Sequence, residues 1–289
     1  MEMKFQPITQ DAMRAQEWAM LLKGATPERK KIFETLKEKQ WFQNTSRDLQ
    51  KTLLTLPDKG AENHDGFLKN LSERPETLAN IKVERLIDLP KGAFVVLPKF
   101  EVSRVDNPST RFTYEYVSWR NGPLSGAKGV VFVEKEGKAT HFIVLKGDKF
   151  APGKNTFDTI GGFIDKPKDE AAIHEGTMKE IRDELGVSTL TVSRTVDLGR
   201  VLTDEGLTNN EPKLFAAFIS SDEAKKITSD PVNPDIYELK NGAVVLPMKD
   251  LPKVVMENSD GLFLSTIARA WAKGIITPPD AWQKQSVSV

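Results

Sequence analysis

Three carboxylates share one face of a predicted helix in the second half of the chain. Glu180, Asp183 and Glu184 stand three and four residues apart, and residues at that spacing project from the same side of a helix. Like charges crowded on one stripe repel one another, so the arrangement costs stability unless a cation lies among them. Carboxylate oxygens are the ligands that hard divalent ions such as Mg²⁺ prefer, with waters and a phosphate completing the shell. The residues therefore indicate a metal–phosphate site.

The same residues could form the solvated face of an ordinary amphipathic helix, because the pattern Glu-x-x-Asp-Glu is common. Their surroundings favour the metal site. A glycine pair, Gly161-Gly162, closes a predicted strand upstream. On the helix, Ile181 and Leu185 can turn toward a core, and Gly186-Val187 follows as a typical helix ending. We therefore expect a strand, a tight glycine turn and a helix that present carboxylates to a ligand.

This arrangement resembles the signature of the Nudix hydrolases. That signature runs Gly, five residues, Glu, seven residues, then Arg-Glu-apolar-x-Glu-Glu-x-Gly-apolar. Its second half resembles residues 179–187, which read Lys-Glu-Ile-Arg-Asp-Glu-Leu-Gly-Val. Its first half resembles Gly162, with Asp165 and Pro167 after it. The likeness identifies the acidic helix and the glycine turn as the two halves of one site.

The chain departs from the family pattern in three ways. The spacing from Gly162 to Lys179 is seventeen residues where the family has fourteen. Lys179 replaces the usual Arg, and Asp183 replaces the first Glu of the pair. The Glu expected near position 168 is Lys168, which leaves Asp169 or Glu170 as substitutes. In the family that Glu and the Arg form an ion pair, and a Lys cannot make the planar, bidentate pair that Arg makes. The metal-holding carboxylates are retained, whereas their support is altered.

The resemblance implies a fold and a branch of the family. The fold class is α/β (α+β): a Nudix-type α/β/α sandwich with a mixed sheet, covering roughly residues 100 to 275. The sequence Gly-Gly-Phe-Ile-Asp and the loop that starts at Gly199-Arg200 most resemble those of the ADP-ribose and nucleotide-sugar pyrophosphatases. Members of that branch commonly carry a β segment before the core and form homodimers. The branch often has Pro-Gly where this chain has Glu205-Gly206, which weakens a specific assignment to ADP-ribose.

The resemblance also implies a ligand set for Mg²⁺ or Mn²⁺. Glu180 and Glu184 are the first choices as metal ligands, and Asp183 completes the set. The shorter side chain of Asp183 could shift it to a water-mediated role. A backbone carbonyl of the Gly161-Gly162 turn, assigned here to Gly162, would coordinate as well, because the chain bends sharply there with its backbone close to the ligand.

Other residues could serve the reaction around that metal. A general base is needed, and Glu205 and Glu211 are candidates in the polar loop 203–212, although the loop could equally be an acidic, solvent-exposed segment. Arg200 could pair with a phosphate or belong to a surface ion pair. Phe163 and Phe157 flank the glycine turn, where each could stack on a base or pack in a core.

Composition limits the classes of function. The 289 residues are 39% apolar and 28% charged, and 41 basic residues balance 41 acidic ones, so no long-range attraction to nucleic acid or an acidic membrane is expected. The absence of cysteine excludes disulfides, thiolate catalysis and cysteine-ligated zinc. The start of the chain lacks the apolar core of a signal peptide, and no apolar run is long enough for a membrane span. We expect a cytoplasmic protein.

Periodicity divides the chain into three parts. Residues 1–80 are expected to form a helical extension, in which Thr26-Pro27 opens a helix and residues 64–80 are polar. Residues 81–280 are expected to form the Nudix hydrolase domain, with an N-terminal β segment over about 81–125, and residues 281–289 a tail. Expected elements of the domain are strands at 93–97, 111–117, 129–133, 141–145, 156–160, 190–192, 196–202, 213–219 and 243–247, a polar connection at 146–155, and a closing helix at 263–273.

Two hypotheses from different classes follow. The first is a metal-dependent hydrolase that splits the pyrophosphate of a nucleoside diphosphate linked to another group, as in ADP-ribose or a nucleotide sugar. The second is a catalytically weak or inactive Nudix module that binds a nucleotide and acts in regulation or scaffolding, which the altered Lys179, Lys168 and the longer spacing favour. An isopentenyl-diphosphate isomerase-like activity is disfavoured because one common type relies on a catalytic cysteine. No basic stretch interleaved with aromatics indicates nucleic-acid binding.

Overall fold

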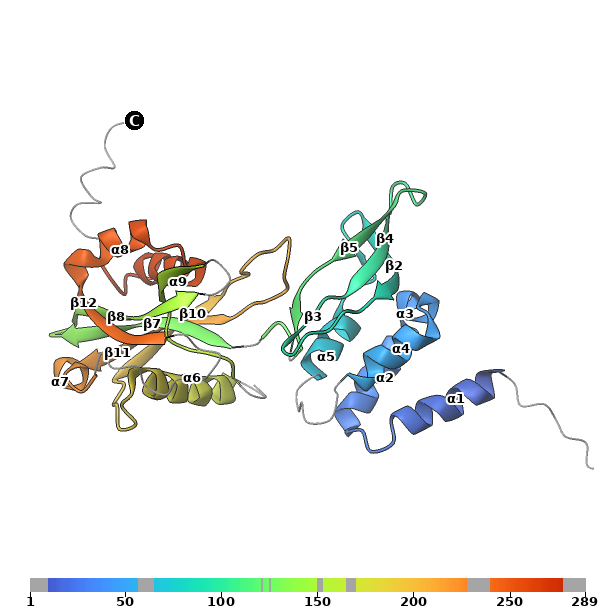
Figure 1. Ribbon diagram of the computed structural model, residues 1–289, viewed down its shortest axis with the longest axis horizontal. Coiled ribbons are helices and arrows are strands. Elements are labelled where there is room, and N and C mark those ends of the chain that lie inside the picture. The colour runs from blue at the N-terminus through green and yellow to red at the C-terminus, as the bar shows by residue number, and fades with distance from the viewer. Residues whose placement is uncertain are drawn as a thin grey trace, which may run out of the picture. The chain divides into compact units, whose positions relative to one another are not determined.

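The computed structural model describes residues 10–56, 65–120, 122–124, 126–149, 153–164, 170–227 and 240–277. The chain divides into two compact units (Figure 1). The first unit contains residues up to 123 together with 204–209, and the second unit contains residues 124–203 and those from 210 onward. The loop 204–209 therefore belongs to a different unit from the strands on either side of it.

The first unit begins with helices. Thr26 caps the second of them, because its side-chain oxygen accepts a hydrogen bond from the Arg29 N–H at 3.1 Å, and Pro27 occupies the first helical position as predicted. The last helix was not expected, since residues 64–80 look polar in the sequence, but its apolar residues Phe67, Leu68 and Leu71 recur on one face and are buried. The helices are α1 (Gln10–Leu21), α2 (Pro27–Glu38), α3 (Gln40–Asn44), α4 (Arg47–Thr55) and α5 (Asp65–Glu73).

An antiparallel sheet follows the helices in the first unit. Its strand order is β1-β2-β4-β5, and a separate two-stranded ladder joins β3 to β6. The strands are β1 (Thr77–Leu78), β2 (Ile81–Asp88), β3 (Val95–Val96), β4 (Lys99–Arg104), β5 (Arg111–Glu115) and β6 (Ser118–Trp119). Strand β4 has no counterpart among the elements expected from the sequence, although Phe100 and Val102 alternate with polar residues as in a half-buried strand.

Helices and strands of the first unit share one hydrophobic core. Leu36 and Leu53 from the helices pack in the same cluster as Leu86 of β2 and Phe100 of β4. The ring of Trp41 meets the ring of Phe100 edge-on, with centroids 5.5 Å apart. The boundary expected at residue 80 thus falls inside this unit, and as a unit of packing the N-terminal segment extends to residue 123.

The second unit is built on a mixed sheet with the order β10-β11-β7-β8-β12, and β9 pairs with β8. Strands β11 and β7 run parallel, whereas the other neighbours are antiparallel. The strands are β7 (Ala127–Lys135), β8 (Lys138–Lys149), β9 (Lys154–Asp158), β10 (Arg194–Arg200), β11 (Lys213–Ser220) and β12 (Lys240–Pro247). The helices are α6 (Glu170–Leu185), α7 (Ser221–Ala224), α8 (Leu251–Glu257) and α9 (Gly261–Ala272), with a 3-10 turn at Met248–Asp250.

Alternation along the central strands creates two cores. Val131 and Val133 of β7 lie in one cluster with Ile181 of α6, whereas Val130 and Phe132 lie in another cluster that contains residues of α8 and α9. Figure 1 shows α6 on one face of the sheet and α8 and α9 on the other. The expected α/β/α sandwich with a mixed sheet is confirmed.

Several local predictions for the second unit differ from the structure. Residues 190–192 are not a strand, and the connection expected at 146–155 contains the end of β8 and the start of β9. Helix α8 was not expected. The hairpin between β7 and β8 and the closing helix α9 are confirmed. No helix in the described residues has both the length and the apolar character that crossing a membrane requires.

Candidate functional site

The glycine turn, Gly161–Gly162, is fastened to the first residues of β7. Gly129 and Ile160 exchange two backbone hydrogen bonds, of 2.8 and 2.9 Å. The next contact along is a 3.2 Å hydrogen bond from the Ala127 N–H to the carbonyl oxygen of Gly162. Phe163 then forms a bridge with Gly126. Backbone pairing on both sides therefore fixes where the turn presents its peptide groups.

Gly161 has a conformation that only glycine adopts readily. Its φ is +120°, and a Cβ at this position would overlap the carbonyl oxygen of Ala127. The turn can approach β7 this closely because no side chain stands between the two backbones. The close approach seen at Gly161 is to the backbone of β7, and the predicted approach of the turn to a ligand stays a prediction.

Two carboxylates of α6 reach the glycine turn. Glu184 accepts a hydrogen bond from the Gly161 N–H, with 2.5 Å between the nitrogen and Oε2. A Cβ on Gly162 would lie 2.5 Å from Oε2 of Glu180, so this carboxylate packs directly against Gly162. The adjoining face of the helix is anchored, since Ile181 and Leu185 are fully buried in the core of the second unit. The helix thus holds both acids over the turn.

Asp183 does not share this environment. It is exposed, whereas Glu180 and Glu184 are half-buried. Across the described parts of the chain, no set of three or more histidine, cysteine, aspartate or glutamate side chains is gathered tightly enough to hold a metal ion. The predicted stripe therefore separates into a pair of acids at the turn and a third acid facing solvent.

Lys128 is a functional candidate that the sequence interpretation missed. Its ammonium group donates a hydrogen bond to the carbonyl oxygen of Gly161, and the side chain is half-buried. The signal was present in the sequence, since Lys128 interrupts an otherwise small and apolar run from Ala127 to Val133. The positive charge of Lys128 thus lies on the same turn that the two glutamates contact.

Two further acids lie close to the residues before the turn. Asp158 is buried at the end of β9 and accepts a hydrogen bond from the Thr159 N–H at 2.8 Å. Asp260 caps α9 through a 2.7 Å hydrogen bond from the Phe263 N–H. Burial and then the Asp158 charge raise the pKa of Asp260, while the charge of Lys128 acts in the opposite direction.

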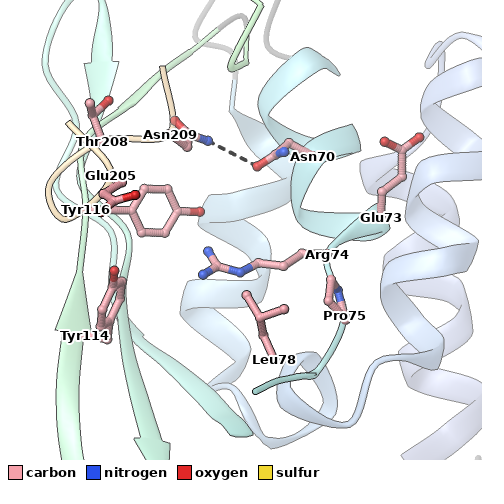
Figure 2. A pocket seen from close by; sticks show the side chains of 10 residues that line it. All are labelled: Asn70, Glu73, Arg74, Pro75, Leu78, Tyr114, Tyr116, Glu205, Thr208 and Asn209. Carbon is pink, nitrogen blue, oxygen red and sulfur yellow. Dashed lines mark hydrogen bonds between the residues drawn. The ribbon is translucent and has the colours of Figure 1, made fainter. Parts of the chain in front are cut away.

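The two candidate general bases lie in different units. Glu211 belongs to the second unit, is half-buried, and precedes Lys213 by two residues. Lys213 pairs with Ala127 in the parallel β11–β7 ladder, and the Ala127 N–H donates a hydrogen bond to the Gly162 carbonyl oxygen. Glu211 therefore lies two residues from a strand position whose partner contacts the glycine turn. Glu205 belongs to the first unit and lines a cavity there (Figure 2).

The remaining predicted residues lie in several different environments. Arg200 is the exposed last residue of β10, and its carbonyl oxygen accepts a 2.8 Å hydrogen bond from Arg269. Phe163 is 48% exposed and does not fill a core, whereas Phe157 packs against the core beneath α8 and α9. Lys179 is exposed. Asp165, Pro167, Lys168 and Asp169 lie outside the described residues, and Glu170 is the first residue of α6.

Comparison with known proteins gives likenesses among solved structures only. No protein-family model and no curated protein matches the chain. Among solved structures, one similar chain is that of an "ADP compounds hydrolase". It is 12% identical, the match covers 70% of this chain and 98% of that chain, and the TM-score is 0.49. At 12% identity, the chemistry of this site has to be argued from its own residues.

Proposed function

We propose that the second unit is a hydrolase dependent on Mg²⁺ or Mn²⁺ that cleaves the pyrophosphate of a nucleoside diphosphate linked to another group, in the manner of the Nudix enzymes. The observation that carries the proposal is the meeting of Glu180 and Glu184 at the glycine turn. Two acids one helical turn apart are held half-buried at a turn whose carbonyl groups are also oxygen ligands.

The residues present suit a hard divalent ion. Glu180 and Glu184 would hold it, and Asp183, being exposed, would act through water. Gly161 and Gly162 each accept one hydrogen bond at the carbonyl oxygen, from Lys128 and Ala127, and a carbonyl oxygen has a second lone pair. When bound, such an ion neutralises phosphate charge and lowers the pKa of a water molecule.

Side chains around the turn would bind and orient the substrate. We assign Phe163 to stacking on a base, because it is 48% exposed beside the turn. We assign Arg200 to a phosphate and Glu211 to the role of general base, since the β11–β7 ladder leads from Glu211 toward the turn. Glu205, in the first unit, is the less favoured base. A homodimer and a cytoplasmic location stay predictions.

Lys128 favours a second candidate function. Its ammonium already contacts the Gly161 carbonyl, and a fixed cation beside two carboxylates offsets part of the negative charge that would attract a metal. A module that binds a nucleotide without hydrolysing it, for regulation or scaffolding, is consistent with that arrangement and with the altered support residues Lys168 and Lys179.

A substrate panel separates the two functions. ADP-ribose, nucleotide sugars, NADH, dinucleoside polyphosphates and capped RNA would be incubated with the protein in Mg²⁺ and in Mn²⁺, and released phosphomonoester measured. Turnover of at least one compound that requires a divalent ion supports the hydrolase. No turnover of any compound, together with saturable binding of one, would favour the binding module.

A matched pair of variants assigns any activity to this site. Glu184→Gln keeps the shape of the side chain and an oxygen for the Gly161 N–H but removes the charge. We expect turnover to fall by about 10- to 100-fold or more, as it does when a metal site loses an essential group. Glu175→Gln makes the same change at an exposed position of α6 and should leave turnover unchanged. Wild-type turnover in Glu184→Gln would rule out the assigned role.

A further inference from the structure

The first unit contains a cavity that the proposed hydrolase chemistry does not use. Its volume is about 400 Å³, and all the residues that line it belong to the first unit. They come from three separate segments: residues 70–78 at the end of α5 and beyond, residues 114–116 at β5, and residues 205–209. Figure 2 shows side chains from the three segments, among them Arg74, Tyr116 and Asn209, around one space.

The third segment is held in place by backbone pairing. The Val117 N–H donates to the carbonyl oxygen of Leu207 at 2.8 Å, and Val117 forms a parallel bridge with Thr208. The side chain of Asn209 then donates a 3.1 Å hydrogen bond to Oδ1 of Asn70. Residues 205–209 are therefore held both to the segment at β5 and to the segment at the end of α5.

A buried hydroxyl lies in this cavity without a partner. Tyr116 is only 4% exposed, and its hydroxyl makes no hydrogen bond within the described residues. Oδ1 of Asn209 is buried and unpartnered in the same sense. Leaving a buried polar atom unpaired costs stability, so such atoms are rare unless a ligand or water completes them. Two of them in one cavity make it a candidate binding site, with a ligand or water as the missing partner.

A cation stands beside that hydroxyl. The guanidinium of Arg74 lies over the Tyr116 ring, 5.1 Å from its centroid, and makes no ion pair within the part of the chain that the structure describes. In Figure 2 it points toward the Tyr116 hydroxyl, while the Glu73 carboxylate points away. Burial raises the pKa of Tyr116, and the charge of Arg74 and the closeness of its side chain to the hydroxyl oppose that shift, although the two groups do not meet the geometry of a hydrogen bond. The hydroxyl is therefore a neutral donor at physiological pH.

The remaining lining is partly apolar. The Tyr114 ring and the side chains of Leu78 and Pro75 form one side of the cavity (Figure 2). Glu205 lies at the exposed rim, where water screens its charge. The cavity thus combines an oxyanion-binding pair, Arg74 and Tyr116, with an aromatic and aliphatic wall.

We propose that this cavity binds a small molecule that carries a phosphate or carboxylate on a planar ring system. The anionic oxygens accept hydrogen bonds from the Arg74 guanidinium and the Tyr116 hydroxyl. The ring lies against Tyr114 and Leu78, and a donor group on the ligand satisfies Oδ1 of Asn209. The proposal is independent of the hydrolase function, because it involves other residues in the other unit.

Binding would be measured by calorimetry on the full chain with four probes. A nucleoside monophosphate and an aromatic monocarboxylate carry the two forms of the anion on a ring. The uncharged nucleoside and inorganic phosphate each supply only half of the proposed ligand. We expect saturable binding of at least one ring-bearing anion, and at least about tenfold weaker binding of both half-ligands. The stronger of the two ring-bearing probes identifies the anion as phosphate or carboxylate.

Two variants and a control assign the binding to the cavity. Arg74→Met keeps the length of the side chain and should weaken the best probe by about tenfold or more. Tyr116→Phe removes only the hydroxyl, so it should weaken the probe several-fold while leaving the melting temperature unchanged or higher, because no protein hydrogen bond is lost. Lys69→Met removes a positive charge from an exposed position of α5, the helix that ends just before Arg74, and should leave binding unchanged.

The two readouts for Tyr116→Phe keep the test decisive even where Arg74→Met does not fold. A lower melting temperature with unchanged affinity would mean that the hydroxyl is structural, and it would overturn the proposal. Absence of saturable binding by either ring-bearing anion at millimolar concentration would overturn it as well, and so would binding that Lys69→Met weakens as much as Arg74→Met.

Discussion

The glycine turn of the second unit and the cavity of the first unit treat polar groups in opposite ways. At the glycine turn the hydrogen bonds close on the protein itself: the Gly161 N–H reaches Glu184, and the two carbonyls reach Lys128 and Ala127. In the cavity the Tyr116 hydroxyl and Oδ1 of Asn209 are buried without a partner among the described residues. The polar groups of the glycine turn are satisfied by contacts within the protein, whereas those of the cavity would be satisfied by the proposed ligand.

The difference has a physical consequence for mutagenesis. Changing a group that the protein satisfies internally disturbs both the fold and the chemistry. Changing an unpartnered group, such as the Tyr116 hydroxyl, disturbs binding alone, since its removal relieves a cost in the unliganded protein. Stability and function should therefore change together where the turn contacts backbone, at Gly161, and separately at the cavity.

The largest effect is expected from Gly161→Ala. The added Cβ would overlap the Ala127 carbonyl oxygen, and φ of +120° strains any other residue, so we expect a loss of roughly 3 kcal/mol in the free energy of unfolding, together with loss of activity. Urea denaturation measures it. Gly261→Ala is the control, because a Cβ there meets nothing within 4 Å and stability should change by less than about 0.5 kcal/mol. Equal stability of the two variants would contradict the tight turn.

Gly162→Ala should separate chemistry from stability within the turn. Its Cβ would displace the flexible end of Glu180 rather than backbone, so we expect unfolding free energy to fall by less than about 1 kcal/mol. Turnover should fall by about tenfold or more, since a carboxylate needed at the turn has moved. The measurement is the ratio of turnover to wild type beside a denaturation curve. A variant with full turnover would show that the position of Glu180 is not critical.

The smallest effect concerns pH and Asp260. The folded state raises the pKa of Asp260 above its ordinary value of 3.8, so the contribution of this residue to stability is present below that value and is lost as the pH rises through the folded-state pKa. Asn still caps α9 through its amide oxygen and does not ionise. The melting temperature of Asp260→Asn relative to wild type should therefore increase between about pH 4 and pH 7. A constant difference across that range would contradict the shift.

The sequence could predict the glycine turn because its parts are close along the chain and have strong local rules. Ile181 and Leu185 mark the buried side of α6, which places Glu180 and Glu184 on the adjoining face and Asp183 on the side facing away. The helical pattern therefore accounts for the exposure of Asp183, but it does not show where the glycine turn meets the helix. Lys128 was missed since its contact depends on the pairing of β7 with the residues after β9, which is long-range.

The cavity illustrates the opposite case. Arg74, Tyr116 and Asn209 are far apart in the sequence, and no local pattern connects them. Glu205 was placed with the metal chemistry because it follows β10 and shares a loop with Glu211, yet residues 204–209 belong to the first unit. Residues 1–80 alone were expected to form the N-terminal extension, and the β segment over about 81–125 was assigned to the hydrolase domain. The packing of that β segment on the helices is long-range, so no local pattern places the two in one unit.

Metal binding by the acids at the glycine turn is most directly tested by Mn²⁺ titration, followed through the electron paramagnetic resonance signal of the free ion. The unmodified protein should bind Mn²⁺ saturably, Glu184→Gln should bind it at least about tenfold more weakly, and Glu175→Gln should match the unmodified protein. Equal Mn²⁺ affinity in Glu184→Gln and Glu175→Gln, or no binding by the unmodified protein, would contradict the assignment of Glu180 and Glu184 as metal ligands.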